Sequence, residues 1–83
     1  MRKLGIDTRE LAHPEPLEVA IKTLQQLSND TYLYMLHTKN PIPLLDLAQE
    51  QGYRTLSKEN KVGDWQIVIT KNQEASLEDL MGV

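Results

Sequence analysis

Hydrophobic positions along the chain follow two spacings, one typical of strands and one typical of helices. Leu4 and Ile6 alternate with polar neighbours and predict a short first strand that ends near Asp7. Pro14 and Pro16 then fit the first turn of a helix, where their missing N–H groups would have no partner anyway. The apolar residues that follow recur at intervals of three and four, which predicts one stripe of an amphipathic helix. These residues are Leu17, Ala20, Ile21, Leu24 and Leu27.

The second half of the chain repeats this order and adds two strands. Residues 32–37 are apolar on both faces, which predicts an interior strand. A second helix is predicted to begin near Pro41 and to end at Gly52, a residue suited to the left-handed backbone after a helix. Residues 53–60 are mostly polar, as an exposed sheet edge tolerates, whereas residues 65–70 form the most apolar run and predict a central strand.

The element order is therefore strand-helix-strand-helix-strand-strand. Helices between strands serve as right-handed crossovers, so the first three strands are expected to run parallel, with the last strand antiparallel in a hairpin. The apolar fourth strand fits best between the second and the third. These points predict an α/β (α+β) two-layer sandwich: a four-stranded mixed sheet of order 1-2-4-3 with two helices on one face. The other face is expected to be partly open, or covered by a partner or by the tail.

Residues 1–71 are expected to form this domain, and residues 72–83 a C-terminal tail. Ser76 and Asp79 match a capping-box pattern, so a short helix and disorder both stay open for the tail.

Composition narrows the functional classes. The chain has 83 residues, a net charge of −3 and no cysteine, which excludes disulfides, thiolate metal sites and any persulfide intermediate. Charges of both signs are mixed without a basic stripe, so neither nucleic acid nor an anionic membrane is an expected partner. No apolar run approaches the ~20 residues of a membrane span, and the first residues do not resemble a signal peptide. The cytoplasm is the expected location.

Several short segments resemble the TusA/SirA-type sulfur carriers, over roughly residues 3–71. The matching segments are Ile6-Asp7, Leu11, His13-Pro14-Glu15-Pro16-Leu17, Asp30-Thr31-Tyr32-Leu33 and Gly52-Tyr53. In that family an Asp follows the first strand, and a Cys-Pro-x-Pro motif opens the first helix. The resemblance implies the same fold, in which the motif cysteine holds a persulfide and passes sulfur to partner proteins. His13 stands at the cysteine position, and an imidazole cannot hold a transferable sulfur atom. The chain therefore resembles a cysteine-less branch of uncharacterised function.

Candidate ligand-binding residues gather at one predicted edge of the sheet. The carboxyl ends of the first two strands should bring Asp7, His13 and His37 together, and the start of the fourth strand should add Asp64 and Trp65. Open α/β sheets usually bind ligands at this edge. A histidine at a helix start is more often a cap or loop residue, and one at a strand end is more often half-exposed. Two histidines with Asp7 would suit a metal, but their spacing matches no compact ligand motif, so neither metal nor cofactor is expected.

The leading functional hypothesis is a non-catalytic protein-interaction or regulatory module. Two helices cover only one face of such a sheet, and aromatic side chains on the other face would form an apolar patch. A protein partner is expected to dock on the rim formed by Arg9, Glu10, His13, Glu15 and Lys39.

The alternative hypothesis is a small-ligand or metal-binding regulatory domain that uses Asp7, His13, His37 and Trp65. Neither a nucleophile–histidine–acid arrangement nor a glycine-rich phosphate loop is visible, so an enzyme is not expected. The oligomeric state is left open by the sequence.

Overall fold

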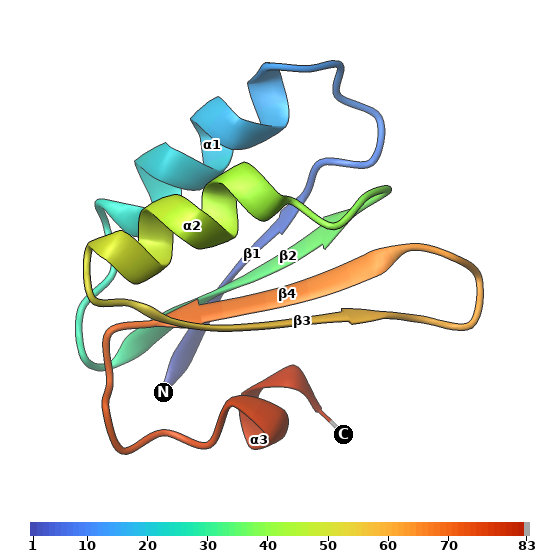
Figure 1. The fold of residues 1–83 in the computed structure, drawn as a ribbon. Helices are drawn as coiled ribbons and strands as arrows, with labels where there is room; N and C mark the ends of the chain where they lie inside the picture. Colours follow the sequence, from blue (N-terminus) through green and yellow to red (C-terminus); the bar gives the residue numbers. More distant parts are fainter. Residues whose placement is uncertain (83) are drawn as a thin grey trace.

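The chain folds as a four-stranded sheet with two helices on one face and a third helix on the other (Figure 1). The computed structural model describes residues 1–82. The elements are β1 (Arg2–Asp7), α1 (Glu15–Leu24), β2 (Thr31–His37), α2 (Ile42–Glu50), β3 (Arg54–Glu59), β4 (Trp65–Thr70) and α3 (Leu77–Met81). No helix within residues 1–82 has both the length and the apolar character needed to cross a membrane.

The sheet confirms the predicted strand order. Its strands lie in the order β1-β2-β4-β3, with β1 parallel to β2 and β4 antiparallel to both of its neighbours. In the register, Asp7 lies beside Leu36 at the end of the β1–β2 ladder, and His37 lies opposite Trp65 at the start of β4. The carboxyl ends of β1 and β2 and the beginning of β4 therefore meet at one edge of the sheet.

Helix α1 is shorter than the apolar stripe predicts. Pro14 occupies the N-cap position and Pro16 lies in the first turn, but the helix ends at Leu24. Leu27 is still only 4% exposed, because a tight turn in which its N–H donates to the carbonyl of Leu24 returns it to the core. The N–H of Ser28 then donates to the hydroxyl of Thr31 at 2.8 Å instead of continuing the helix. A local side-chain bond of this kind competes with the helical pattern.

The main core lies between the sheet and helices α1 and α2. Successive residues of a strand point to opposite faces, so alternate positions of β2 and β4 face these helices. The buried members are Ala20, Leu24, Leu27, Leu33, Met35, Leu44, Leu45, Ala48, Ile67 and Ile69. Burial of this apolar surface fixes the two helices over the sheet, with both helix N-termini near the edge where β1 and β2 end (Figure 1).

Helix α3 covers part of the opposite face of the sheet. Its Met81 is 5% exposed and packs with Tyr32 and Val68. The hydroxyl of Ser76 accepts a hydrogen bond from the N–H of Asp79 at 3.3 Å, as the capping pattern predicts. Of the two conformations left open for the tail, the structure therefore shows a helix, while the division of the chain at residue 71 stays a prediction.

Of the aromatic side chains of the sheet, Tyr34 stays half-buried on this face, where it packs against Tyr32 and Val68. Tyr32 is buried beneath the tail, and Trp65 packs against the core under α1 and α2. The guanidinium of Arg54 donates to the carbonyls of Asn72 and Ala75, which holds the tail against the sheet. The tail therefore covers part of this face, which is one of the outcomes that the sequence left open.

Candidate functional site

The predicted site residues are divided between two adjoining hollows at the edge where β1 and β2 end. The first, the histidine pocket, is lined by Leu11, His13, Pro16, Leu17, Met35, His37, Thr38, Lys39, Asn40, Pro41, Pro43 and Leu44. The second, the ion-pair hollow, is lined by Asp7, Arg9, Glu10, Leu11 and Asp64. Leu11 belongs to both, so the two hollows are neighbours.

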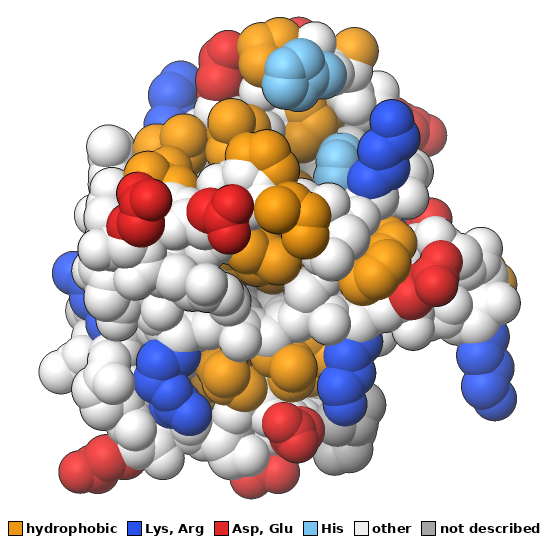
Figure 2. All heavy atoms as spheres, viewed as in Figure 1, with side chains coloured by type: hydrophobic (Ala, Val, Ile, Leu, Met, Phe, Trp, Pro, Cys, Tyr) orange, Lys and Arg blue, Asp and Glu red, His pale blue; other side chains and the backbone are white. Residues whose placement is uncertain are grey.

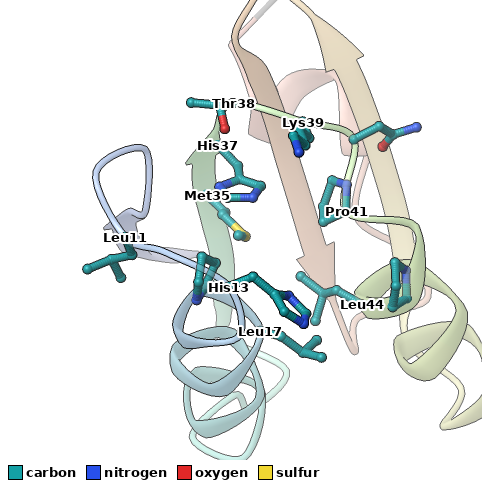
Figure 3. A pocket seen from close by; sticks show the side chains of 12 residues that line it. Leu11, His13, Leu17, Met35, His37, Thr38, Lys39, Pro41 and Leu44 are labelled. Atoms are coloured by element: carbon teal, nitrogen blue, oxygen red, sulfur yellow. The ribbon is translucent and has the colours of Figure 1, made fainter.

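The histidine pocket lies between the N-terminal ends of α1 and α2 and encloses about 320 Å³ (Figure 3). His13 reaches into it from the segment before α1, and His37 reaches in from the last position of β2. Below His37 lies Met35, which is 1% exposed and belongs to the main core. Figure 2 shows both histidines at the same end of the molecule, with hydrophobic side chains close to each. The pocket is thus an apolar depression with polar groups at its sides.

A buried hydroxyl sets the orientation of the His37 ring. Thr8 has no exposed surface, and its Oγ1 lies 2.9 Å from the carbonyl oxygen of Leu36, to which only the hydroxyl can donate. The hydroxyl has a single hydrogen, so the contact of 3.0 Å between Oγ1 and Nδ1 of His37 is donated by the ring. His37 in its neutral form therefore carries its hydrogen on Nδ1. Its Nε2 keeps a lone pair that can accept a hydrogen bond from a ligand.

The other polar residues of the pocket differ in how they are held. Asn40 is anchored, because its Oδ1 accepts a hydrogen bond of 2.7 Å from Ser57 on β3. His13 lies directly before the N-cap residue Pro14, which confirms the prediction that it stands at the start of α1. The side chains of His13 and Lys39 are exposed and make no hydrogen bond or ion pair within residues 1–82. These two side chains can meet a ligand without breaking an existing contact.

The ion-pair hollow is organised around Arg9. Its guanidinium donates to both carboxylate oxygens of Asp7, at 2.9 and 2.7 Å, and to Asp64 at 3.0 Å. Hydrogen bonds from the Arg9 side chain, and then from its backbone N–H, lower the pKa of Asp7 to about 2. The side-chain hydrogen bonds of Arg9 to Asp7, and then to Asp64, raise the pKa of Arg9. The Arg9 guanidinium is thus fully paired, while the hollow as a whole, with three carboxylates and one guanidinium, is acidic.

Asp7 lies at the predicted edge of the sheet, but in the hollow next to the one that the two histidines line. Asp7 accepts a hydrogen bond of 3.1 Å from the backbone N–H of Arg9, and its carboxylate pairs with the Arg9 guanidinium in the ion-pair hollow. Trp65 lies opposite His37 in the ladder, yet it packs into the core and does not line the pocket. Of the predicted ligand-binding residues, only His13 and His37 come together in one hollow.

The predicted docking rim is also divided. His13 and Lys39 line the histidine pocket, while Arg9 and Glu10 line the ion-pair hollow. Glu15 lies exposed in the first turn of α1, where a carboxylate complements the helix dipole. Arg9 is not available as an unpaired cation, because two carboxylates already hold it.

Within residues 1–82, no group of three or more His, Asp or Glu side chains is arranged to hold a metal ion. The pocket lining contains Lys39 and no carboxylate. A divalent cation there would face an ammonium group without an anionic ligand to balance its charge. The donor set of the pocket is therefore unsuited to the metal site considered from the sequence.

Three residues of the site, Thr8, Met35 and Leu44, are not among those predicted from the sequence. Met35 and Leu44 belong to the main core, and they line the pocket because the core reaches the surface between the two helix starts. Thr8 had one available signal: the residue after Asp7 falls beside His37 once the parallel register of the first two strands is known. That register is not visible in a single sequence.

Comparison with known protein families identifies the family of the chain. The family model described as an uncharacterised conserved protein (DUF2249) matches residues 5–71. The chain therefore belongs to the DUF2249 family. The searches of the curated proteins and of the solved structures found no match.

Proposed function

We propose that the protein is a non-catalytic binding module that takes a small molecule into the histidine pocket. The observation that carries this proposal is the convergence of His13 and an oriented His37 over an apolar floor. Binding pockets of roughly 300–1,000 Å³ with apolar walls and a few placed polar groups are typical small-molecule sites. A volume of about 320 Å³ accommodates a compact ligand of roughly ten non-hydrogen atoms, since a water molecule occupies roughly 30 Å³ of liquid.

The proposal includes a relationship to the TusA/SirA-type carriers without their sulfur chemistry. The strand-helix order and the sheet order β1-β2-β4-β3 support this relationship, since they agree with the fold that the resemblance implies. His13 takes the position of the motif cysteine, and the chain has no cysteine anywhere that could hold a persulfide. The position that would carry sulfur in the relatives would here contact a ligand. The cytoplasmic location expected from the sequence stays a prediction.

A pocket-filling variant tests the proposal. Leu17 lies in the pocket wall and Ile21 lies one turn further along α1, outside the pocket, and both are half-buried. Leu17→Trp should fill the pocket, while Ile21→Trp adds the same side chain to the same helix and serves as the control. Fragments detected by ligand-observed NMR should bind the wild type and Ile21→Trp but not Leu17→Trp, with folding checked by circular dichroism. Equal binding by a folded Leu17→Trp protein, or no bound fragment at all, would contradict the proposal.

A protein-docking role at the same rim is the second candidate function. It is supported by the exposure of Arg9, Glu10, His13, Glu15 and Lys39 around the two adjoining hollows. A partner on this rim would contact Glu10 but not Glu50, an exposed residue at the opposite end of α2.

Site-specific photocrosslinking separates this second role from the first. A photoreactive residue at position 10 should capture one defined protein that the same probe at position 50 does not capture. The Lys39→Glu substitution should then abolish the capture. Recovery that is the same from both positions, or unaffected by Lys39→Glu, would count against the docking role.

A further inference from the structure

We propose, building on the binding role above, that the ligand of the histidine pocket is a small carboxylate with an apolar body. The apolar part is implied by the walls, where Leu11, Leu17 and Leu44 surround the Met35 floor. A fully polar ligand would leave these side chains in contact with polar atoms and would gain nothing from their burial.

The negative charge is implied by Lys39. It is exposed at the pocket, it has no acidic partner within residues 1–82, and no Asp or Glu lines the same hollow. The chain as a whole carries a net charge of −3, so a pocket whose lining carries one ammonium group and no carboxylate is a local exception. An anion in this pocket pairs with Lys39 without competing against an existing salt bridge.

The N-terminal end of α2 adds to the positive potential that Lys39 gives the pocket, as a comparison with α1 shows. The first turn of α1 holds Glu15 and Glu18, which complement the positive end of its dipole. The first turn of α2 has no acidic residue and no side-chain cap. The N–H of Leu44 in this first turn has no acceptor within residues 1–82, as is usual at a helix start. The N-cap residue of this helix, Pro41, lines the pocket. An anion beside Lys39 would therefore also complement the positive end of α2.

His37 has a different role from Lys39. In the neutral ring of His37, Nε2 accepts a hydrogen bond. Taken alone, this acceptor could bind a hydroxyl, an amide N–H or an ammonium group of a ligand. Lys39 decides between these, because a ligand ammonium beside it would be repelled. The pocket is therefore suited to a carboxylate that also carries a hydrogen-bond donor or leaves Nε2 to water.

Three small aromatic compounds of nearly equal shape test this inference on the full chain. Benzoate, benzamide and benzylammonium differ mainly in charge, and each is titrated while the backbone amide signals of ¹⁵N-labelled protein are followed. Benzoate should bind about tenfold more tightly than benzamide, and benzylammonium more weakly than both. Lys39→Gln should reduce the affinity for benzoate by about three- to tenfold and leave that for benzamide unchanged. Lys22→Gln, which removes an exposed lysine from the last turn of α1, should change neither.

The possible failures are distinguishable. If all three compounds bind in the pocket with equal affinity, the charge inference is wrong and the binding role stands. If benzoate binds best but Lys39→Gln and Lys22→Gln weaken it equally, the preference comes from the general field of the protein, and the inference is again wrong. If none of the three binds the wild type at millimolar concentration while other fragments do, the ligand class is wrong. The binding role fails if no fragment binds, or if a folded Leu17→Trp protein binds the fragments as well as the wild type does.

Discussion

The histidine pocket and the ion-pair hollow lie side by side and share Leu11, yet they differ in how their polar groups are satisfied. In the ion-pair hollow, Arg9 is held by Asp7 and Asp64 at hydrogen-bonding distance. In the histidine pocket, His13 and Lys39 have no partner within residues 1–82. Charged residues at a sheet edge are therefore a poor guide to a binding site by themselves. What separates the two hollows is whether their cation has already been paired: Arg9 is held by two carboxylates, and Lys39 by none within residues 1–82.

The two hollows also differ in their apolar surroundings. Met35 joins the pocket to the main core, whereas four of the five residues that line the ion-pair hollow are charged. A ligand in the pocket would replace water on an apolar surface, and an anionic ligand in the ion-pair hollow would have to compete with Asp7 and Asp64 for Arg9. The first arrangement favours binding, and the second favours a structural role.

The largest expected effect is on stability at the pocket floor. Met35→Ala removes a fully buried side chain and should lower the free energy of unfolding by about 2–5 kcal/mol. Glu10→Ala, an exposed change in the ion-pair hollow, should lie within about 0.5 kcal/mol of the wild type. Urea unfolding of both variants provides the measurement. Similar free energies of unfolding for Met35→Ala and Glu10→Ala would contradict the view that the pocket is built on the core and the ion-pair hollow on the surface.

A smaller effect is expected at Thr8. Thr8→Val keeps the shape of the side chain but removes the acceptor for the Nδ1 hydrogen of His37. This loss should lower the free energy of unfolding by about 1–3 kcal/mol. Thr8→Ser retains the hydroxyl and serves as the control. Nitrogen NMR of the ring should show the Nδ1–H form in the wild type and in Thr8→Ser. In Thr8→Val the Nδ1–H form of His37 should no longer be the main tautomer. If it is still the main tautomer in this variant, the Thr8 hydroxyl does not orient the ring.

The smallest effect concerns Asp7. Its pKa is lowered in the folded protein to about 2, so its pairing with Arg9 contributes stability above the unfolded pKa of about 3.9. That contribution is lost as the pH falls through the folded pKa. Arg9→Gln should raise the pKa of Asp7 toward its ordinary value and remove this pH dependence between about pH 4 and 2. A carbon NMR titration of the Asp7 carboxyl group measures the shift, and an unchanged midpoint in the variant would contradict the assigned cause.

The topology could be predicted from the sequence because each element carries its own periodicity. The polar 53–60 run and the apolar 65–70 run placed β3 at the edge and β4 inside, as the structure confirms. The end of α1 was predicted too late, because the bond between Ser28 and Thr31 depends on a turn that periodicity does not describe.

The candidate site could be predicted only in part, for a related reason. Strand order brought Asp7, His13 and His37 to one edge, but side-chain pairing decides which of them share a hollow. The contact of Arg9 with Asp64 joins residues 55 positions apart, and no local pattern signals it. The covering of Tyr32 by Met81 is likewise a tertiary contact made by a segment whose conformation the sequence left open.

The most direct test of the pocket as the binding surface is a map of backbone amide shifts during a benzoate titration of the wild-type protein. The account predicts saturable shifts at Leu17, His37 and Leu44, with little change at Arg9 and Asp64. Saturable shifts that centre on Arg9 and Asp64, or no saturable shift at any residue of the histidine pocket, would contradict it.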